Sequence, residues 1–348
     1  MSCYHPSFIQ RSVHLLTGDV ETRFIGGIGS VSNCLESLGV LQESYDGKKT
    51  LDFIPRTYQN GKAHDFIQIP CGKCIGCRID YSRSWADRMT YHVIGREDQS
   101  YFITLTYDEK HIENLPYSDN YGLYSLQYDD MTAFIKRLRN RFKDAEIDYY
   151  YSGEYGDQEF RPHFHLICYN MEIPDLEFWK LNNNGDPLYT SEIIHGLWKN
   201  GLCAVARFDW LNAAYTASYV EKKRDGRAMC EYTAVGIEPE KCRCSRRPGI
   251  AHDYYMEHYA DIWKNEGLAV GREVNSRGHL GIPRYFRKLA ENGAGFDEYM
   301  EYKKRCLDRS NILNPLKLEN SSFDLDRVGE LLKFEEREIL SRSKNKTL

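Results

Sequence analysis

The sequence predicts an α+β fold in which a central, largely antiparallel sheet is flanked by helices. Three observations support this prediction. Tyr101–Tyr107 is β-branched and aromatic throughout, as expected of a buried strand. Two further extended segments, 147–155 and 162–169, are joined by a short turn-rich connector, which indicates a hairpin and therefore antiparallel pairing. Helical patterns alternate with these strands in the order strand, helix, strand, strand, helix, strand, helix.

The first helix is expected over residues 82–96, and the clearest one follows the first strand. Its apolar side chains recur at helical spacing and form one stripe: Met131, Phe134, Ile135, Leu138 and Phe142. Its other faces carry cations and no acid: Lys136, Arg137, Arg139, Arg141 and Lys143. A solvated surface is the usual explanation of such a face, and contact with phosphates is the second.

The later segments complete the order. A helix near 187–199 and a short strand near 201–208 precede a helix from Trp210 to Lys223, with Asp209 as its candidate N-cap. Beyond residue 225 the chain is loop-rich, and it becomes helical again from about residue 283. The sequence thus predicts an N-terminal segment 1–97 with a cysteine cluster and a helix, a core 98–225, a loop-rich basic segment 226–282 and a helical C-terminal extension 283–348.

Size and composition favour a globular, intracellular protein. The 348 residues are 41% hydrophobic, which is enough for a core. The net charge of −5 argues against a generally basic surface but leaves room for a local basic groove. No apolar run approaches membrane-spanning length, and the first residues lack a signal-peptide core, so no membrane association is expected. Neither Gly26–Gly29 nor Gly47–Thr50 has the spacing of a nucleotide-binding loop.

Two histidines separated by one apolar residue, His163 and His165, are the most informative feature of the chain. Alternate residues of a strand share a face, so both imidazoles point one way while Phe164 and Leu166 point to the core. Ordinary surface histidines would be the usual interpretation of an isolated pair. Here the pair offers two neutral nitrogen ligands to one cation.

A third ligand is expected from the preceding strand. A turn centred between Gln158 and Glu159 places Glu154 directly opposite His163, and opposed residues project on the same side of a sheet. Glu159 is the competing carboxylate, because a register shift of one residue would exchange the two. Two imidazoles and one carboxylate form a mixed site that suits Mg²⁺ or Mn²⁺ bound together with phosphate oxygens.

The helix after residue 209 carries Tyr215 and Tyr219, which are four residues apart and therefore share a face, and Lys222 and Lys223 continue that face. Core packing is the usual role of such a tyrosine pair, but two cations are an unusual border for a buried seam. A phenol, with a reference pKa of about 10, becomes a useful nucleophile when a metal polarises the phosphate and a cation stabilises the developing charge. Metal, phenols and lysine together indicate phosphodiester transesterification.

Eleven cysteines in an intracellular chain favour thiols or metal ligands over disulfides. Cys71, Cys74 and Cys77 recur at a spacing typical of zinc ligands, and structural zinc requires four. Cys3 is the preferred fourth ligand, and its rivals are His5 and the pair Cys242 and Cys244. Reduced thiols without metal are the alternative. Arg246 and Arg247 belong to a polar loop or contact DNA phosphates.

Three segments, in this order, resemble the motifs of the HUH endonuclease superfamily, specifically its rolling-circle replication initiators with two tyrosines. They are Phe102–Tyr107, His163–His165 and the Tyr-x-x-x-Tyr-x-x-Lys array that begins at Tyr215. Further stretches are similar to the replication initiators of gokushovirus-like Microviridae, which are small single-stranded DNA phages: Cys3–Pro6, Cys71–Arg78 and Ser245–Ile250. The resemblance spans roughly residues 1–285.

The resemblance implies an HUH nuclease core in 98–225 that nicks single-stranded DNA at a phage origin in the cytoplasm of a bacterial host. Either Tyr215 or Tyr219 would become 5′-phosphotyrosyl-linked and release a 3′-OH, which a host polymerase extends with the help of a host helicase. The other tyrosine would then attack the regenerated origin, and the 3′-OH released by that attack would rejoin the ends into a circle. Lys222 matches the spacing of the family's lysine, and Lys223 matches it less well.

Two rival functions remain open from the sequence. One is a zinc-containing DNA-binding protein without catalysis, in which the histidine pair is structural. The other is a related HUH transposase or relaxase, against which the paired tyrosines and the lack of a third histidine argue.

Overall fold

The computed structural model describes residues 7–26, 57–119, 121–156, 159–182, 185–222, 232, 234–272, 274–275 and 278–320. It divides into two compact units, one formed by Met1–Asp80 with Lys303–Leu348 and the other by Tyr81–Tyr302. The predicted roles of the four sequence segments stay predictions. No helix in the described part of the chain combines the length and apolarity that a membrane crossing needs.

The larger unit contains a seven-stranded sheet in which every pairing is antiparallel. This confirms the predicted α+β class. The strands are β5 (Tyr101–Tyr107), β8 (Asp148–Tyr155), β9 (Pro162–Tyr169), β10 (Glu177–Leu181), β11 (Pro187–Thr190), β12 (Gly201–Arg207) and β13 (Cys242–Cys244), in the spatial order β10-β11-β12-β5-β9-β8-β13. Three adjacent strands, β5, β9 and β8, carry the segments from which the fold was predicted.

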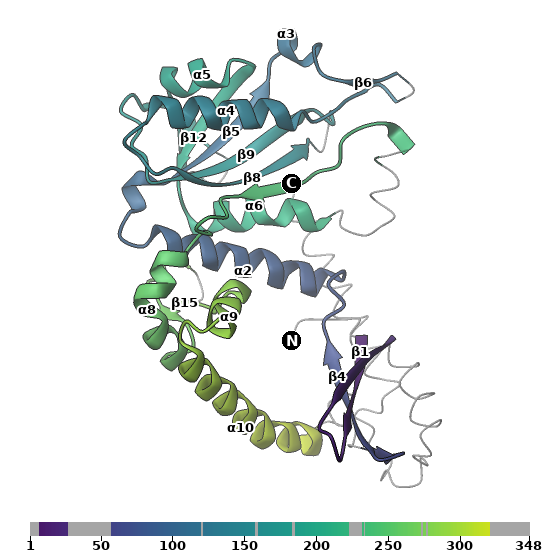
Figure 1. The fold of residues 1–348 in the computed structure, drawn as a ribbon. Coiled ribbons are helices and arrows are strands. Elements are labelled where there is room, and N and C mark those ends of the chain that lie inside the picture. The colour runs from purple at the N-terminus through teal and green to yellow at the C-terminus, as the bar shows by residue number, and fades with distance from the viewer. Residues whose placement is uncertain are drawn as a thin grey trace. The chain divides into compact units, whose positions relative to one another are not determined.

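Helices α4 (Tyr128–Arg141) and α5 (Glu192–Trp198) cover one face of this sheet (Figure 1). The apolar stripe of α4 is buried against alternate residues of β5, as its periodicity predicts. Trp198 lies at the centre of this layer, where it is fully buried and donates its indole N–H to the carbonyl of Thr106. The side chain of Ser191 caps α5 by accepting from the backbone N–H of Ile194.

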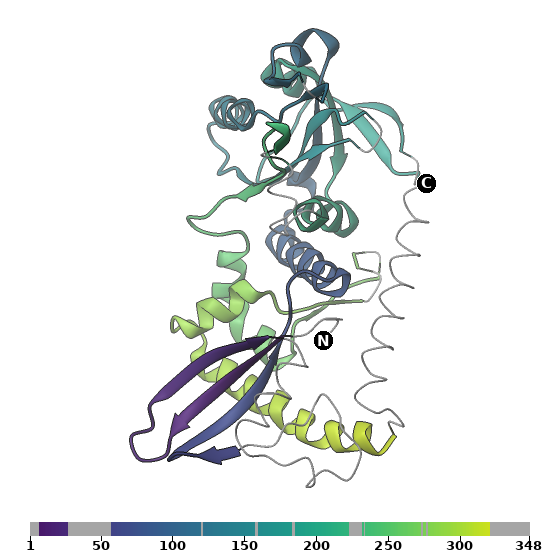
Figure 2. The same cartoon turned by 90° about the vertical axis from the view of Figure 1, so that its right-hand side faces the viewer.

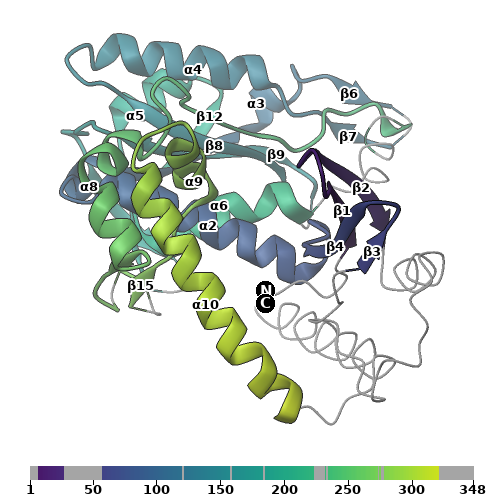
Figure 3. The same ribbon diagram turned by 60° about the horizontal axis from the view of Figure 1, so that its bottom comes forward.

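Helix α6 (Trp210–Lys222) covers the opposite face, and α2 (Ile75–Val93) lies beyond it (Figure 1). Ala213 and Ala217 of α6 share one core with Tyr150 and Ile167 of the sheet. Small alanine side chains let the helix approach the strands closely. Three further helices follow in the chain, and Figure 3 labels them: α8 (His252–Lys264), α9 (Arg284–Glu291) and α10 (Phe296–Asn320).

The short elements of the larger unit lie in its connections. They are η2 (Glu97–Gln99), α3 (Glu109–Ile112), the pair β6 (Tyr117–Ser118) and β7 (Leu123–Tyr124), and the pair β14 (Leu268–Ala269) and β15 (His279–Leu280).

The smaller unit contains a four-stranded antiparallel sheet that the sequence did not predict (Figure 2). Its strands are β1 (Ser7–His14), β2 (Val20–Gly26), β3 (Thr57–Gln59) and β4 (Lys62–Ile69), in the order β2-β1-β4-β3 (Figure 3). Phe8 is buried, whereas Val20 and Phe24 are exposed, so the burial in β2 does not alternate.

Three other expectations need correction. The helix expected near 187–199 begins only at Glu192, because Pro187–Thr190 is strand β11 and pairs at Tyr189 with Val205. The helix expected over 82–96 begins earlier and is α2. The segment 226–282, expected to be loop-rich, contains α8. Residues 321–348, the end of the expected helical extension, lie outside the described residues.

Candidate functional site

Three potential metal ligands meet on the face of the sheet that α6 covers. Glu154 stands opposite His163 across the β8–β9 pair, which is the register predicted from the turn. His165 follows two residues later on β9, opposite Ser152. Both Nε2 atoms point at the same oxygen, Oε2 of Glu154, at 3.1 Å from His163 and 2.7 Å from His165. The alternation of strand side chains therefore brings the three groups together.

The second nitrogen of each ring is also held. Nδ1 of His163 lies 3.0 Å from the carbonyl oxygen of Arg161, and because a carbonyl only accepts, this nitrogen carries the proton. Nδ1 of His165 lies 3.2 Å from Oγ1 of Thr104, a hydroxyl that can donate or accept. A hydrogen bond at Nδ1 fixes the orientation of each imidazole ring and directs its Nε2 toward the position that a metal ion would occupy.

Burial and charge set the protonation states of the three groups. Glu154 and His165 are 4% and 5% exposed. Burial opposes ionisation of Glu154, but hydrogen bonds from both histidines outweigh it and lower the pKa of the carboxyl to about 2. Burial favours the neutral ring of His163, but Glu154 outweighs it and raises the pKa of that imidazole. At His165 burial dominates and lowers the pKa of the imidazole.

The geometry fits a single divalent cation. The three ligand atoms lie within 4.8 Å of one another. An octahedral ion about 2.1 Å from its ligands places neighbouring ligands about 3 Å apart, close to the separations observed here. Two imidazole nitrogens and one carboxylate oxygen can hold a divalent cation and leave positions for other ligands. Glu159, the rival carboxylate, is exposed and is not in this group.

Tyr215 of α6 lies against this group. Its ring centroid is 5.2 Å from that of His165 and 6.5 Å from that of Phe102, both in edge-on contact, and the residue is 46% exposed. The ring of Phe102 also stacks on His165, at 5.5 Å and nearly parallel to it. Tyr219 and Lys222 are helical residues of α6, and Lys223 lies outside the described residues.

Sequence reasoning missed the supporting residues Thr104 and Arg161. Thr104 faces the site because it alternates with the buried residues Ile103 and Leu105, and it pairs with His165 across the strands. That pairing depends on the register of β5 against β9, which strand alternation alone does not supply. Arg161 is placed by its side chain, whose Nε donates to the carbonyl of Tyr107.

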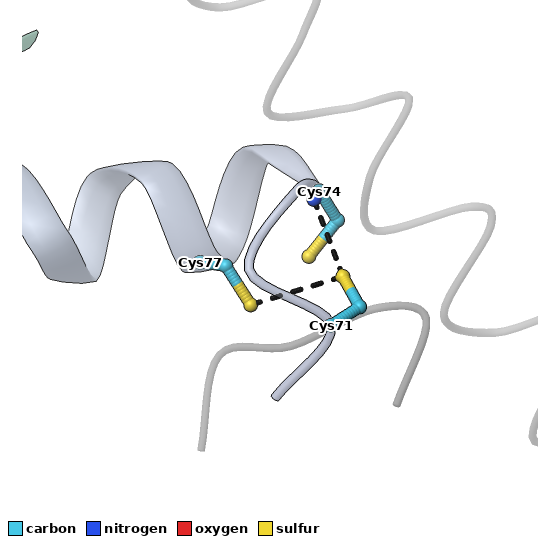
Figure 4. A group of neighbouring side chains, drawn as sticks. All are labelled: Cys71, Cys74 and Cys77. Carbon is cyan, nitrogen blue, oxygen red and sulfur yellow. Dashed lines mark hydrogen bonds between the residues drawn. The ribbon is translucent and has the colours of Figure 1, made fainter. Parts of the chain in front are cut away.

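The cysteine cluster forms a second candidate metal site, in the smaller unit (Figure 4). Cys71 precedes α2, Cys74 immediately precedes its first residue, and Cys77 lies in its first turn. Sγ of Cys71 is 3.9 Å from Sγ of Cys77 and accepts from the backbone N–H of Lys73 and Cys74, at 3.4 and 3.3 Å. Gly72, at φ +72°, makes the tight turn that aims these groups at the sulfur.

The candidates for a fourth zinc ligand are placed as follows. Cys3 and His5 lie outside the described residues. Cys242 and Cys244 belong to β13 of the larger unit, where they pair with Ser152 and Tyr150.

Comparison with known proteins points to one family. A family model for the replication-associated proteins called ORF2 or gene 2 protein matches residues 100–224, which include β5, the candidate metal site and all of α6. Replication-associated protein VP4 of Bdellovibrio phage phiMH2K is 37% identical over 274 residues, covering 73% of this chain and 77% of the relative.

Two further relatives each share 30% identity with the chain. Replication-associated protein ORF2 of Spiroplasma virus 4 is 30% identical over 239 residues, covering 68% of this chain and 72% of the relative. Replication-associated protein ORF4 of Chlamydia phage 1 is 30% identical over 257 residues, covering 69% of this chain and 59% of the relative. No solved structure matches the chain significantly.

Proposed function

The chain belongs to the family of phage replication-associated proteins, and we propose that it initiates rolling-circle replication by nicking and rejoining single-stranded DNA. One observation carries this proposal. Glu154, His163 and His165 converge through three atoms on one side of the sheet, and Tyr215 lies against them. A metal-binding triad beside a phenol has the parts that a phosphodiester transesterase needs. We assign the nuclease core to residues 98–225.

Each residue has a defined task in the proposed reaction. Glu154, His163 and His165 would hold Mg²⁺ or Mn²⁺, which supplies Lewis-acid polarisation of the scissile phosphate when bound. The contacts of Arg161 and Thr104 keep the two imidazoles in place. Phe102 packs against the ring of His165 and keeps water from that side.

The nick is a transfer between two oxygens on phosphorus. A tyrosine Oη, from Tyr215 or Tyr219, forms a bond to the phosphorus as the bond from phosphorus to the 3′ oxygen breaks. The phenol loses its proton, and the leaving 3′ oxygen gains one. Lys222, with Lys223 as the alternative, stabilises the charge that develops on the phosphoryl oxygens.

The second tyrosine repeats this attack at the regenerated origin after one round of synthesis. The 3′-OH released by the second attack then attacks the first phosphotyrosine, which frees the first tyrosine and closes the circle. Each exchange breaks one phosphate ester and forms another, so no ATP is needed. A host polymerase would extend the first 3′-OH and a host helicase would separate the strands, so the protein would act in the cytoplasm of a bacterial host.

A covalent adduct is the direct test of this function. We expect the full-length protein, incubated with MnCl₂ and single-stranded oligonucleotides tiled across the genome that encodes it, to form a DNA adduct that survives denaturing electrophoresis. Adduct formation should be confined to one or a few oligonucleotides and should disappear in EDTA. A folded protein that binds these oligonucleotides but forms no adduct with any divalent ion would instead be a DNA-binding protein without catalysis.

We further propose that Cys71, Cys74 and Cys77 hold a structural Zn²⁺. Zinc bound to sulfur at about 2.3 Å places tetrahedral ligands about 3.8 Å apart. The separation of 3.9 Å between Cys71 and Cys77 fits that value, and the two backbone donors on Cys71 suit a thiolate. A metal here would join the loop before α2 to its first turn and add to the free energy of folding. Cys3 is our preferred fourth ligand.

Zinc content tests this assignment. We expect about one zinc per chain that is lost in Cys74→Ser but kept in Cys203→Ser, a matched change at a partly buried thiol of β12. The metal is measured by mass spectrometry after gel filtration, and the melting temperature of Cys74→Ser should fall. Zinc that persists in Cys74→Ser and disappears in His163→Ala would place the metal at the other site and overturn the proposal.

A further inference from the structure

One edge of the seven-stranded sheet continues into a tight turn. Among the residues that the structure describes, β13 pairs with β8 alone, so it is an edge strand. Directly after it, Arg246 and Gly249 form an isolated antiparallel bridge that closes a four-residue turn. Arg246, Arg247 and Pro248 are exposed at its tip, whereas Gly249 is buried at its base.

Several contacts fix this turn to the body of the larger unit. The backbone N–H of Ser245 donates to the carbonyl of Tyr149 at 2.9 Å, and the backbone N–H of Tyr149 donates to the hydroxyl of Ser245 at 3.1 Å. At the other end, the backbone N–H of Ala251 donates to Nδ1 of His92 at 3.0 Å. The turn is therefore held at both ends, and its arginines start from a fixed backbone.

A half-buried arginine supports the base of the turn. The guanidinium of Arg88 lies 3.8 Å from the ring centroid of Tyr285 and 4.7 Å from that of Trp85, and its Nε donates to the carbonyl of Ile250 at 2.9 Å. A Cβ on Gly249 would lie 2.8 Å from Oη of Tyr285 and 3.0 Å from Arg88. The turn therefore packs closely on this support.

Two more arginines continue the exposed charge along the sheet. Arg243 of β13 lies opposite Tyr151 of β8, and its guanidinium is 5.5 Å from the ring centroid of Tyr128. Arg139 of α4 lies 5.5 Å from the ring centroid of Tyr149, whose ring stacks on Tyr151 at 5.9 Å. We define the arginine edge by its four exposed members, Arg139, Arg243, Arg246 and Arg247.

The four side chains of the arginine edge form no close ion pairs: within the described ranges, none of them makes a salt bridge with a carboxylate. The nearby carboxylate Asp148 lies 3.3 Å from Nε2 of His92, and the charge of Arg139 is one of the causes that lower the pKa of this carboxyl. In a chain of net charge −5, four such arginines on one sheet edge are a local exception. Arginine presents a planar fork that matches phosphate oxygens in pairs.

We propose that the arginine edge binds the phosphate backbone of single-stranded DNA. Arg243 lies opposite Tyr151, which packs with α4, whereas Glu154 lies on the face of the sheet that α6 covers. Ser245, which precedes the two arginines at the tip of the turn, lies beside Tyr149, five residues before Glu154 on β8, or about 17 Å along a strand. The identity of the polyanion rests on the proposed function, whereas its binding to the arginine edge does not.

Salt-dependent binding tests the proposal separately from nicking. The probe is a fluorescent 30-nucleotide oligo(dT), titrated in EDTA so that no cleavage occurs. Each phosphate contact on a single strand contributes about 0.7 to the slope of log Kd against log salt concentration. We expect Arg246→Gln/Arg247→Gln to reduce that slope by about 1.4 and to weaken binding about 3- to 10-fold at 0.15 M salt.

Two variants isolate the cause. Arg246→Lys/Arg247→Lys keeps the charge and should keep the slope. Arg287→Gln/Lys288→Gln removes two exposed charges from α9 and should match the wild type. An unchanged slope in the glutamine variant, with an unchanged melting temperature, overturns the proposal even if the protein nicks DNA. A reduced slope in a protein that never forms an adduct supports the arginine edge and refutes the nuclease.

Discussion

Replacing His163 with alanine is expected to lower the rate of nicking by more than about 100-fold and to leave the affinity for single-stranded DNA nearly unchanged. The reason is that His163 contributes one of the three candidate ligand atoms. Removing a group that hydrogen-bonds to a metal ligand typically lowers metal affinity or activity about 10- to 100-fold. Removing the ligand itself should therefore lower activity further.

A graded series makes this prediction specific to the metal. Thr104→Val keeps the shape of the strand residue but removes the oxygen 3.2 Å from Nδ1 of His165, and it should slow nicking by about 10- to 100-fold. Part of that loss should be recovered at high MnCl₂, whereas the loss in His163→Ala should not.

The rates are measured under single-turnover conditions, and binding is measured in EDTA. The melting temperature of each variant serves as the folding control. Nicking by His163→Ala at the wild-type rate would exclude the triad as the metal site.

The candidate site was predictable because strand geometry is a local property. A period of two places His163 and His165 on one face, and the length of the turn then sets Glu154 opposite His163. The same reasoning predicts the buried stripe of α4, which packs through Met131 and Phe134. In each case neighbours in sequence decide the outcome, so no knowledge of the remaining fold is needed.

Other elements depend on contacts that the sequence does not display. Helix α8 follows Ala251, which adopts a left-handed backbone conformation and provides no side-chain cap, so the usual start signal is missing. The periodic signal is present, since Tyr255, Tyr259, Ile262 and Trp263 recur at i, i+4, i+7 and i+8 and pack into one core. Strand β11 falls where the sequence predicts helix, because only its pairing with β10 and β12 makes it extended.

The residues that surround the site could not be predicted from the sequence either. Thr104 reaches His165 only because β5 lies beside β9 in one particular register. The support of Arg88 for the turn at Gly249 joins positions that are far apart in the chain. The sequence therefore predicted the potential ligands of the site, while tertiary packing determines what orients them.

Removing both phenols is expected to abolish the covalent adduct, by at least about 1,000-fold, while the metal-binding residues stay intact. Tyr215→Phe/Tyr219→Phe keeps both rings, so the packing of Tyr215 against His165 and Phe102 is preserved. Only the oxygen that would bond to phosphorus is lost. DNA binding in EDTA and the melting temperature should match those of the wild type.

The single variants separate the two exchanges, because circle formation needs two nucleophiles and a nick needs one. We expect that neither Tyr215→Phe nor Tyr219→Phe releases closed circles from a substrate carrying two copies of the origin. The variant that still forms the adduct retains the tyrosine that attacks first. Products are resolved on denaturing gels after protease digestion. The wild type serves as the positive control and the double variant as the negative control. Closed circles from both single variants would show that one phenol performs both steps, and the two-tyrosine mechanism would then be wrong.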